Sequence, residues 1–192
     1  MKKKLLVALS LVTMILFSAN LYTQERGSSR IGFQLGGYLP LERWSDVVSN
    51  GIGVSVLYNH KIISTISITG TVGYYTFPSK HDVGEALESV GNISYVISPV
   101  LAGLRAGFVR DDQAFQPYLG FDLGVFLAIH QYKTSAGLNL TLPQGSSLFG
   151  FAPVIGFRLR LGLNVDLDIN AKWNIAKDIN HIGLNLGVLF RN

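Results

Sequence analysis

Apolar and polar residues alternate along most of the chain after residue 30. The alternation covers eight segments, at 31–39, 52–58, 62–75, 94–108, 118–130, 149–161, 165–175 and 182–190. In the last segment, Ile182, Leu184 and Leu186 are separated by glycine and asparagine. A period of two residues is typical of a β-strand whose two faces meet different surroundings. The pattern therefore predicts an all-β chain with eight strands.

The two faces of these strands differ in an unusual way. The apolar face carries no Lys, Arg, Asp or Glu, whereas the other face is rich in glycine, at Gly32, Gly36, Gly53, Gly103, Gly120, Gly124, Gly156, Gly183 and Gly187. Glycine is depleted from the solvent face of soluble strands, but small residues suit the narrow interior of an eight-stranded barrel. Hydrocarbon offers no hydrogen-bond partner for an open sheet edge. We therefore predict a closed, eight-stranded, antiparallel up-and-down transmembrane β-barrel with its apolar face toward lipid.

The segment 94–108 is the least regular of the eight. Ile97 and Leu101 share the face of Gly103 and Arg105, and Pro99 lies inside the segment. Proline has no N–H to donate to a β-ladder. The sequence therefore predicts a bulge or an irregular ladder at this point.

The connections between the strands alternate in length. Residues 40–51, 78–92 and 133–148 are long connections, 59–61 and 162–164 are short, 109–117 is intermediate, and only 176–181 departs from the alternation. Outer-membrane barrels have long extracellular loops and short periplasmic turns. Aromatic residues near the strand ends, among them Tyr38, Tyr75, Phe77 and Tyr118, add the prediction of two interfacial girdles.

The first 24 residues have the three parts of a secretory signal. Lys2, Lys3 and Lys4 precede an uncharged apolar run from Leu5 to Ala19, which is shorter than the ~20 residues of a spanning helix. We predict a signal peptide at 1–22, cleaved between about 19 and 24, and a barrel domain at 23–192. The predicted location is the bacterial outer membrane.

Composition removes several classes of function. Three of the four units of net charge come from the lysines of the signal, which leaves 16 − 3 = 13 basic against 12 acidic residues, so a nucleic-acid partner is excluded. The absence of cysteine excludes disulfides and thiolate metal sites. No catalytic or cofactor-binding fingerprint is present, and the sequence predicts no cofactor and no metal.

With these features the chain resembles the small eight-stranded outer-membrane barrels of the OmpA/OmpX type, the outer membrane protein β-barrel domain. The resemblance covers residues 30–192 and includes the last strand, IGLNLGVLFRN, in which Phe190 lies near the end. It implies insertion by the outer-membrane assembly machinery. Roles within the family range over adhesion, surface defence, membrane stabilisation and lipid modification.

Charged residues on the inward face form the first candidate site. They are Arg105, Asp122, Arg158, Arg160, Asp166, Asp168 and Lys172. The basic pair Arg158 and Arg160 and the acidic pair Asp166 and Asp168 flank the short turn near residue 163, so they can pair across neighbouring strands. An eight-stranded barrel is too narrow for an open polar pore. We therefore predict a structural ion-pair network that plugs the lumen.

Histidine provides the second candidate. Of the four histidines only His130 is predicted to lie in the lumen, and the four show no metal-binding spacing. Lipid-A-modifying barrels combine a histidine with a serine and an acidic group. Here Ser135 is the nearest serine and no acidic residue is nearby in the sequence. We predict that the protein is not an enzyme, with lipid-A modification as the alternative function.

The loops form the third candidate, because binding residues concentrate in loops. Trp44 lies in the first long loop, and Asp82, Glu85 and Glu88 lie in the second. We predict a monomer with a structural or surface-interaction role, in contact with the bilayer, lipopolysaccharide and an unidentified extracellular protein. A secreted soluble barrel that binds an apolar ligand is a further alternative.

Overall fold

The computed structural model describes residues 28–63, 65–80, 93–109, 113–133, 139–141, 145–162 and 164–191. The predicted signal peptide lies outside these residues. The elements are β1 (Ser29–Pro40), α2 (Arg43–Val47), β2 (Gly51–Lys61), β3 (Ile66–Pro78), β4 (Ile93–Gly107), β5 (Phe115–Lys133), β6 (Asn139–Thr141), β7 (Ser146–Arg160), β8 (Val165–Ala176) and β9 (His181–Arg191).

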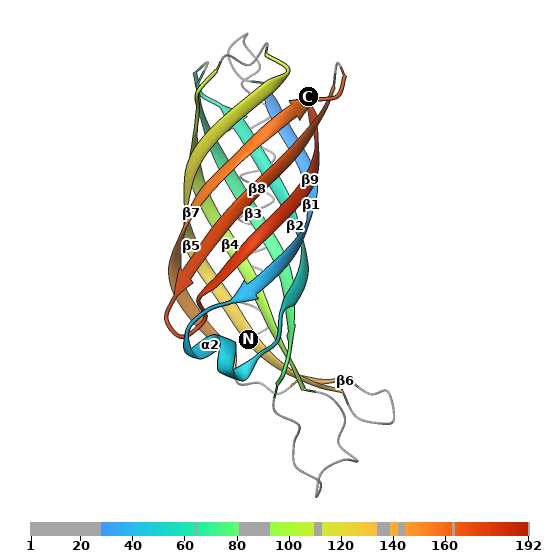
Figure 1. The fold of residues 1–192 in the computed structure, drawn as a ribbon, viewed down its shortest axis with the longest axis vertical. Coiled ribbons are helices and arrows are strands. Elements are labelled where there is room, and N and C mark those ends of the chain that lie inside the picture. Colours follow the sequence, from blue (N-terminus) through green and yellow to red (C-terminus); the bar gives the residue numbers. More distant parts are fainter. Residues whose placement is uncertain are drawn as a thin grey trace, which may run out of the picture.

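The sheet closes on itself as an antiparallel barrel (Figure 1). Each long strand pairs with its neighbour in the chain, and β9 pairs back onto β1, with Phe33 opposite Val188. The short strand β6 pairs only with residues 131–133 of β5 and leaves the barrel wall (Figure 1). The barrel itself thus has eight strands, and the predicted fold class is confirmed.

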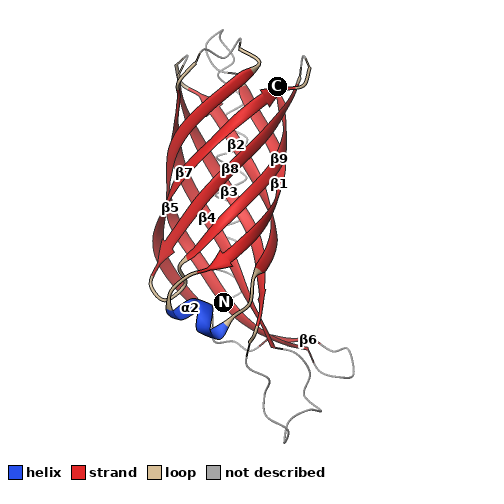
Figure 2. Cartoon of the chain, viewed as in Figure 1, coloured by secondary structure: helices blue, strands red, loops and turns tan. Residues whose placement is uncertain are grey.

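The two ends of the barrel differ. At one end, here called the turn end, β1 begins, β9 ends, and β2, which ends at Lys61, is followed by β3 from Ile66. The short connection predicted at 59–61 is therefore wrong, because these residues pair with β3. The opposite end, here called the loop end, carries helix α2 between β1 and β2 (Figure 2). No helix among the described residues has the length and apolarity that a membrane crossing requires.

The alternation predicted from the sequence sorts side chains to the two sides of the wall. Outward apolar residues are strongly exposed, for example Phe149 at 71%, while the inward carboxylate of Asp122 is 0% exposed. Such a distribution is the reverse of that in a soluble protein. It fits a wall that faces hydrocarbon outside and holds its polar groups inside.

The ladder is irregular at Pro99, as predicted. Pairing between β3 and β4 stops after Val72 opposite Val100 and resumes at Tyr75 opposite Ile97, in the same register. The irregularity is therefore an interruption and not a bulge. Its cause is the missing N–H of proline.

The predicted aromatic girdle needs a correction. Tyr38, Tyr75, Phe77 and Tyr118 are buried and share the inward face with the glycines. Their parity along the strand decides this orientation, because successive side chains point to opposite faces. Outward aromatic residues remain at other positions, such as Trp173.

Candidate functional site in the barrel lumen

The lumen contains two layers of different chemistry. The half toward the loop end is filled by apolar and aromatic side chains, and the half toward the turn end by charged and amide side chains. Most side chains of both layers come from inward positions of the strands. The period-two pattern that forms the wall therefore also determines which side chains enter the lumen.

Stacked rings form the apolar layer. Tyr38 of β1 stacks on Tyr75 of β3 with ring centroids 4.0 Å apart. The edge of His181 meets both rings and also packs against Phe77 and Phe126. Because β1, β3, β5 and β9 all contribute, this layer bridges the lumen from several sides.

Trp44 of α2 closes the apolar layer from the loop end. Its ring lies edge-on to Phe77 at 5.9 Å and to Tyr95 at 5.3 Å, and the residue is only 9% exposed. The prediction of Trp44 as a surface contact is therefore wrong. The helix is amphipathic, and its tryptophan faces the open end of an apolar core that would otherwise meet water.

His181 corrects the prediction that only His130 among the histidines lies in the lumen. His181 is 0% exposed, and its Nδ1 donates to the carbonyl oxygen of Ile179 at 2.9 Å. His181 has the same parity along the strand as Gly183, and this parity indicates that the His181 side chain points into the lumen. The backbone of His130 belongs to β5, opposite Tyr95, but its side chain lies outside the described part of the structure.

In the polar layer, Asp122 of β5 binds two cations. Arg105 of β4 donates from Nη1 to Oδ1 at 2.5 Å and from Nη2 to Oδ2 at 3.0 Å. Nζ of Lys172, on β8, lies 2.7 Å from Oδ2. All three residues are buried. A bidentate guanidinium pair is among the stronger interactions available to a carboxylate.

Asp168 of β8 is the second carboxylate of this layer. It accepts from Arg158 Nε at 3.1 Å, Gln34 Nε2 at 2.9 Å, Asn170 Nδ2 at 2.8 Å and the Tyr118 hydroxyl at 3.1 Å. Neutral donors thus complete the shell of a buried charge, which would be costly if it were left unsatisfied.

Asp166 is paired by residues that sequence reasoning missed. Arg30 Nε of β1 donates to it at 2.8 Å, and Arg191 Nε of β9 donates at 3.0 Å. Arg160 stands opposite Asp166 in the register of β7 and β8. Arg30 shares the face of Gly32, so extending the first strand by one residue would have found it.

Glycines make room for these large side chains. A Cβ atom at Gly103 would collide with the Asp122 carboxylate, and one at Gly120 would collide with Arg105. A Cβ at Gly183 would meet the ring of Tyr38. The inward glycines therefore leave the space that the neighbouring large inward side chains occupy.

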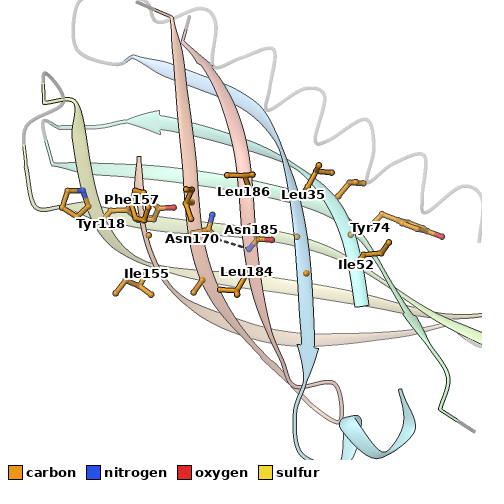
Figure 3. A pocket seen from close by; sticks show the side chains of 18 of the residues that line it. Leu35, Ile52, Tyr74, Tyr118, Ile155, Phe157, Asn170, Leu184, Asn185 and Leu186 are labelled. Carbon is orange, nitrogen blue, oxygen red and sulfur yellow. Dashed lines mark hydrogen bonds between the residues drawn. The ribbon is translucent and has the colours of Figure 1, made fainter. Parts of the chain in front are cut away.

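A wide apolar hollow lies on the outer face of the barrel wall (Figure 3). Leu35, Ile155 and Leu186 line it with exposed, outward-facing side chains. Asn170 and Asn185, joined by a hydrogen bond of 3.0 Å, line it from the buried side (Figure 3). Acyl chains would cover such an apolar surface in a bilayer.

Among the described residues, no group of three His, Cys, Asp or Glu side chains could hold a metal ion. The predicted loop contacts Asp82, Glu85 and Glu88 lie outside the described residues. The ion pairs of the described lumen residues join strands that are adjacent or separated by one strand, an arrangement suited to holding strands together.

Comparison with known proteins finds the fold but no sequence relative. No family model and no curated protein matches the sequence. Neisserial surface protein A matches with a TM-score of 0.59 and 15% identity, over 86% of this chain and 99% of that one. The outer-membrane protein OprG of Pseudomonas aeruginosa matches with 0.56 and 12%, over 87% and 97%. Ail of Yersinia pestis matches with 0.54 and 15%, over 86% and 97%.

These neighbours are bacterial surface and outer-membrane proteins, in agreement with the location predicted from the sequence. Their similarity extends over nearly the whole length of each neighbour. The chain therefore has the fold of the small eight-stranded outer-membrane β-barrels.

Proposed function

We propose that the protein is a monomeric outer-membrane barrel with a plugged lumen, whose role at the cell surface is structural or interactive and does not involve catalysis. The observation that carries the proposal is the filling of the lumen by two successive layers of buried side chains. A channel would need a continuous polar path, and the apolar layer interrupts it.

Contacts between strands on opposite sides of the barrel support the plug. Arg158 of β7 reaches within 3.5 Å of Asn59 on β2, which lies four strands away in either direction around the sheet. Phe126 of β5 packs against His181 of β9, with ring centroids 6.3 Å apart. Side chains that meet across the full width leave little space between them.

The loop end is the surface left for a partner. The chain leaves β3 at Pro78 and re-enters at Ile93, and it leaves β5 at Lys133. The segments 81–92 and 134–138 therefore start and return at the loop end. We propose that these segments contact lipopolysaccharide or an extracellular protein, and that the assembly machinery inserts the barrel.

A loop replacement tests the proposed surface role. Segments 81–92 and 134–138 are replaced by short Gly-Ser linkers, and the variant is expressed in a strain that lacks the gene. Because no described strand or core residue is changed, the variant should still enter the outer membrane and show heat-modifiable gel migration. It should fail to restore the surface attachment and detergent resistance that the unchanged gene restores.

Two outcomes would contradict this proposal. Full restoration by the loop-replaced barrel would place the role in the barrel itself. A mass shift in lipid A that depends on the unchanged protein would support the enzymatic alternative instead. The matched control replaces Leu161 and Gly162 at the turn end, where no surface role is expected.

A further inference from the structure

We propose that a phosphate-type oxyanion binds in a small cavity of the lumen near the turn end. The cavity has a volume of about 40 Å³. Arg30, Lys61, Arg105, Gln116 and Arg158 line it, from five different strands. The cavity lies between the apolar layer and the turn end, in a part of the lumen that is separate from the surface loops.

The charge around the cavity favours an anion. Four of its lining residues are cationic, and none of the described lining residues is acidic. Three of the four, Arg30, Arg105 and Arg158, also pair with aspartates that lie outside the lining. Among the described ion pairs, Asp122 is shared by Arg105 and Lys172, so this buried triad carries one positive charge in excess. Burying an uncompensated charge is costly. A bound anion would compensate it.

A buried donor supplies the second observation. Arg158 is 7% exposed, and its Nη2 has no hydrogen-bond partner in the structure. Its other nitrogens are directed to Asp168 and Asn59, and its guanidinium lies 5.1 Å from the centre of the Tyr118 ring. Because Arg158 lines the cavity, the remaining N–H groups can bind an oxyanion there, with the planar geometry that suits phosphate.

The size of the cavity sets the class of ligand. One water needs roughly 10–15 Å³ of such space, so about 40 Å³ holds a cluster of a few waters or one tetrahedral oxyanion. Inorganic phosphate and the phosphate monoester of a lipid headgroup offer the same oxygens to the site. The experiment therefore includes both sources.

The test measures how phosphate changes the unfolding midpoint of the folded protein in maltoside micelles, with chloride used to hold the ionic strength constant. Dihexanoyl phosphatidic acid is the lipid arm, and dihexanoyl phosphatidylcholine is its control. Lys61→Glu places a carboxylate at the cavity, and Lys177→Glu makes the same charge change on an exposed turn at the loop end. ³¹P line broadening reports binding directly.

We expect phosphate to raise the midpoint of the unchanged protein and of Lys177→Glu, since a ligand of the folded state stabilises it. Lys61→Glu should need at least tenfold more phosphate for the same shift, and Arg158→Gln should show the same loss if it folds. An effect of phosphatidic acid alone would assign the site to a headgroup. The proposal would be overturned if phosphate shifted the midpoints of Lys61→Glu and of the unchanged protein equally, or if neither phosphate source shifted the midpoint.

Discussion

Replacement of Asp122 by asparagine is expected to lower the free energy of unfolding by about 3–5 kcal/mol, because it leaves two buried cations without their carboxylate. Arg105 and Lys172 both pair with Asp122, and all three residues are 4% exposed or less. The measurement is the urea midpoint at which the compact, unheated gel band is lost. Asp46→Asn, on the exposed face of α2, is the control and should leave the midpoint nearly unchanged.

A second variant distinguishes the loss of the two ion pairs of Asp122 from nonspecific destabilisation of the barrel. Replacing Asp122 together with Arg105 and Lys172 by apolar residues of similar volume removes the charges along with their partner. Such replacements are often neutral or stabilising in other proteins, so the triple variant should recover most of the lost stability. Equal midpoints for Asp122→Asn and the unchanged protein would show that the network is not needed for stability.

Replacement of Leu35 by arginine is expected to destabilise the barrel in a bilayer by about 2–4 kcal/mol, the cost of a lipid-facing charge near the midplane. Leu35 lies in the middle of β1 and is 65% exposed on the outer face. The comparison is the unfolding midpoint in lipid vesicles. Ile31→Arg is the matched control, since it lies on the same face of the same strand close to the turn end.

The difference between Leu35→Arg and Ile31→Arg tests how deeply each position lies in the bilayer. A charge near the interface costs roughly 0–1 kcal/mol, so Ile31→Arg should be far milder than Leu35→Arg. Equal and small effects at both positions would contradict the placement of this face in hydrocarbon. Equal and large effects would indicate that both positions pack against protein instead of lipid.

Much of the fold follows from one periodicity. Segments such as 118–130 and 149–161 alternate without a break, and the buried residues among the described side chains of each segment share one parity. The structure extends several strands by a few residues at their ends. It corrects one connection, because β2 runs to Lys61 and β3 begins only at Ile66, so the turn predicted at 59–61 lies after residue 61. Period two is a robust signal because a shift by one residue would exchange the lipid face and the lumen.

The lumen was less accessible to sequence reasoning. Parity identifies the inward charges, but their partners Arg30 and Arg191 lie one residue outside the predicted strands 31–39 and 182–190. Which strands meet across the lumen depends on the tilt and stagger of the closed sheet, and no local pattern encodes these quantities. The contact between Arg158 and Asn59, 99 residues apart, is of this kind.

Trp44 illustrates a different limit. The sequence places it correctly in a loop with an amphipathic stretch, and loops are usually exposed. Its burial depends on Phe77 and Tyr95, which come from two other strands and form the open end of the aromatic layer. A residue that caps a core formed by distant strands is recognised only after the core is assembled.

We propose that the two layers of buried side chains close the lumen. Planar-bilayer recording of the refolded protein tests it directly, with a water-filled porin as the positive control. The expected result is no steady conductance above the bare membrane, because we propose that the packed rings of Tyr38, Tyr75 and His181 block the lumen on the loop side of the ion pairs. A large and stable ionic conductance that copurifies with the compact, heat-modifiable band would contradict the account.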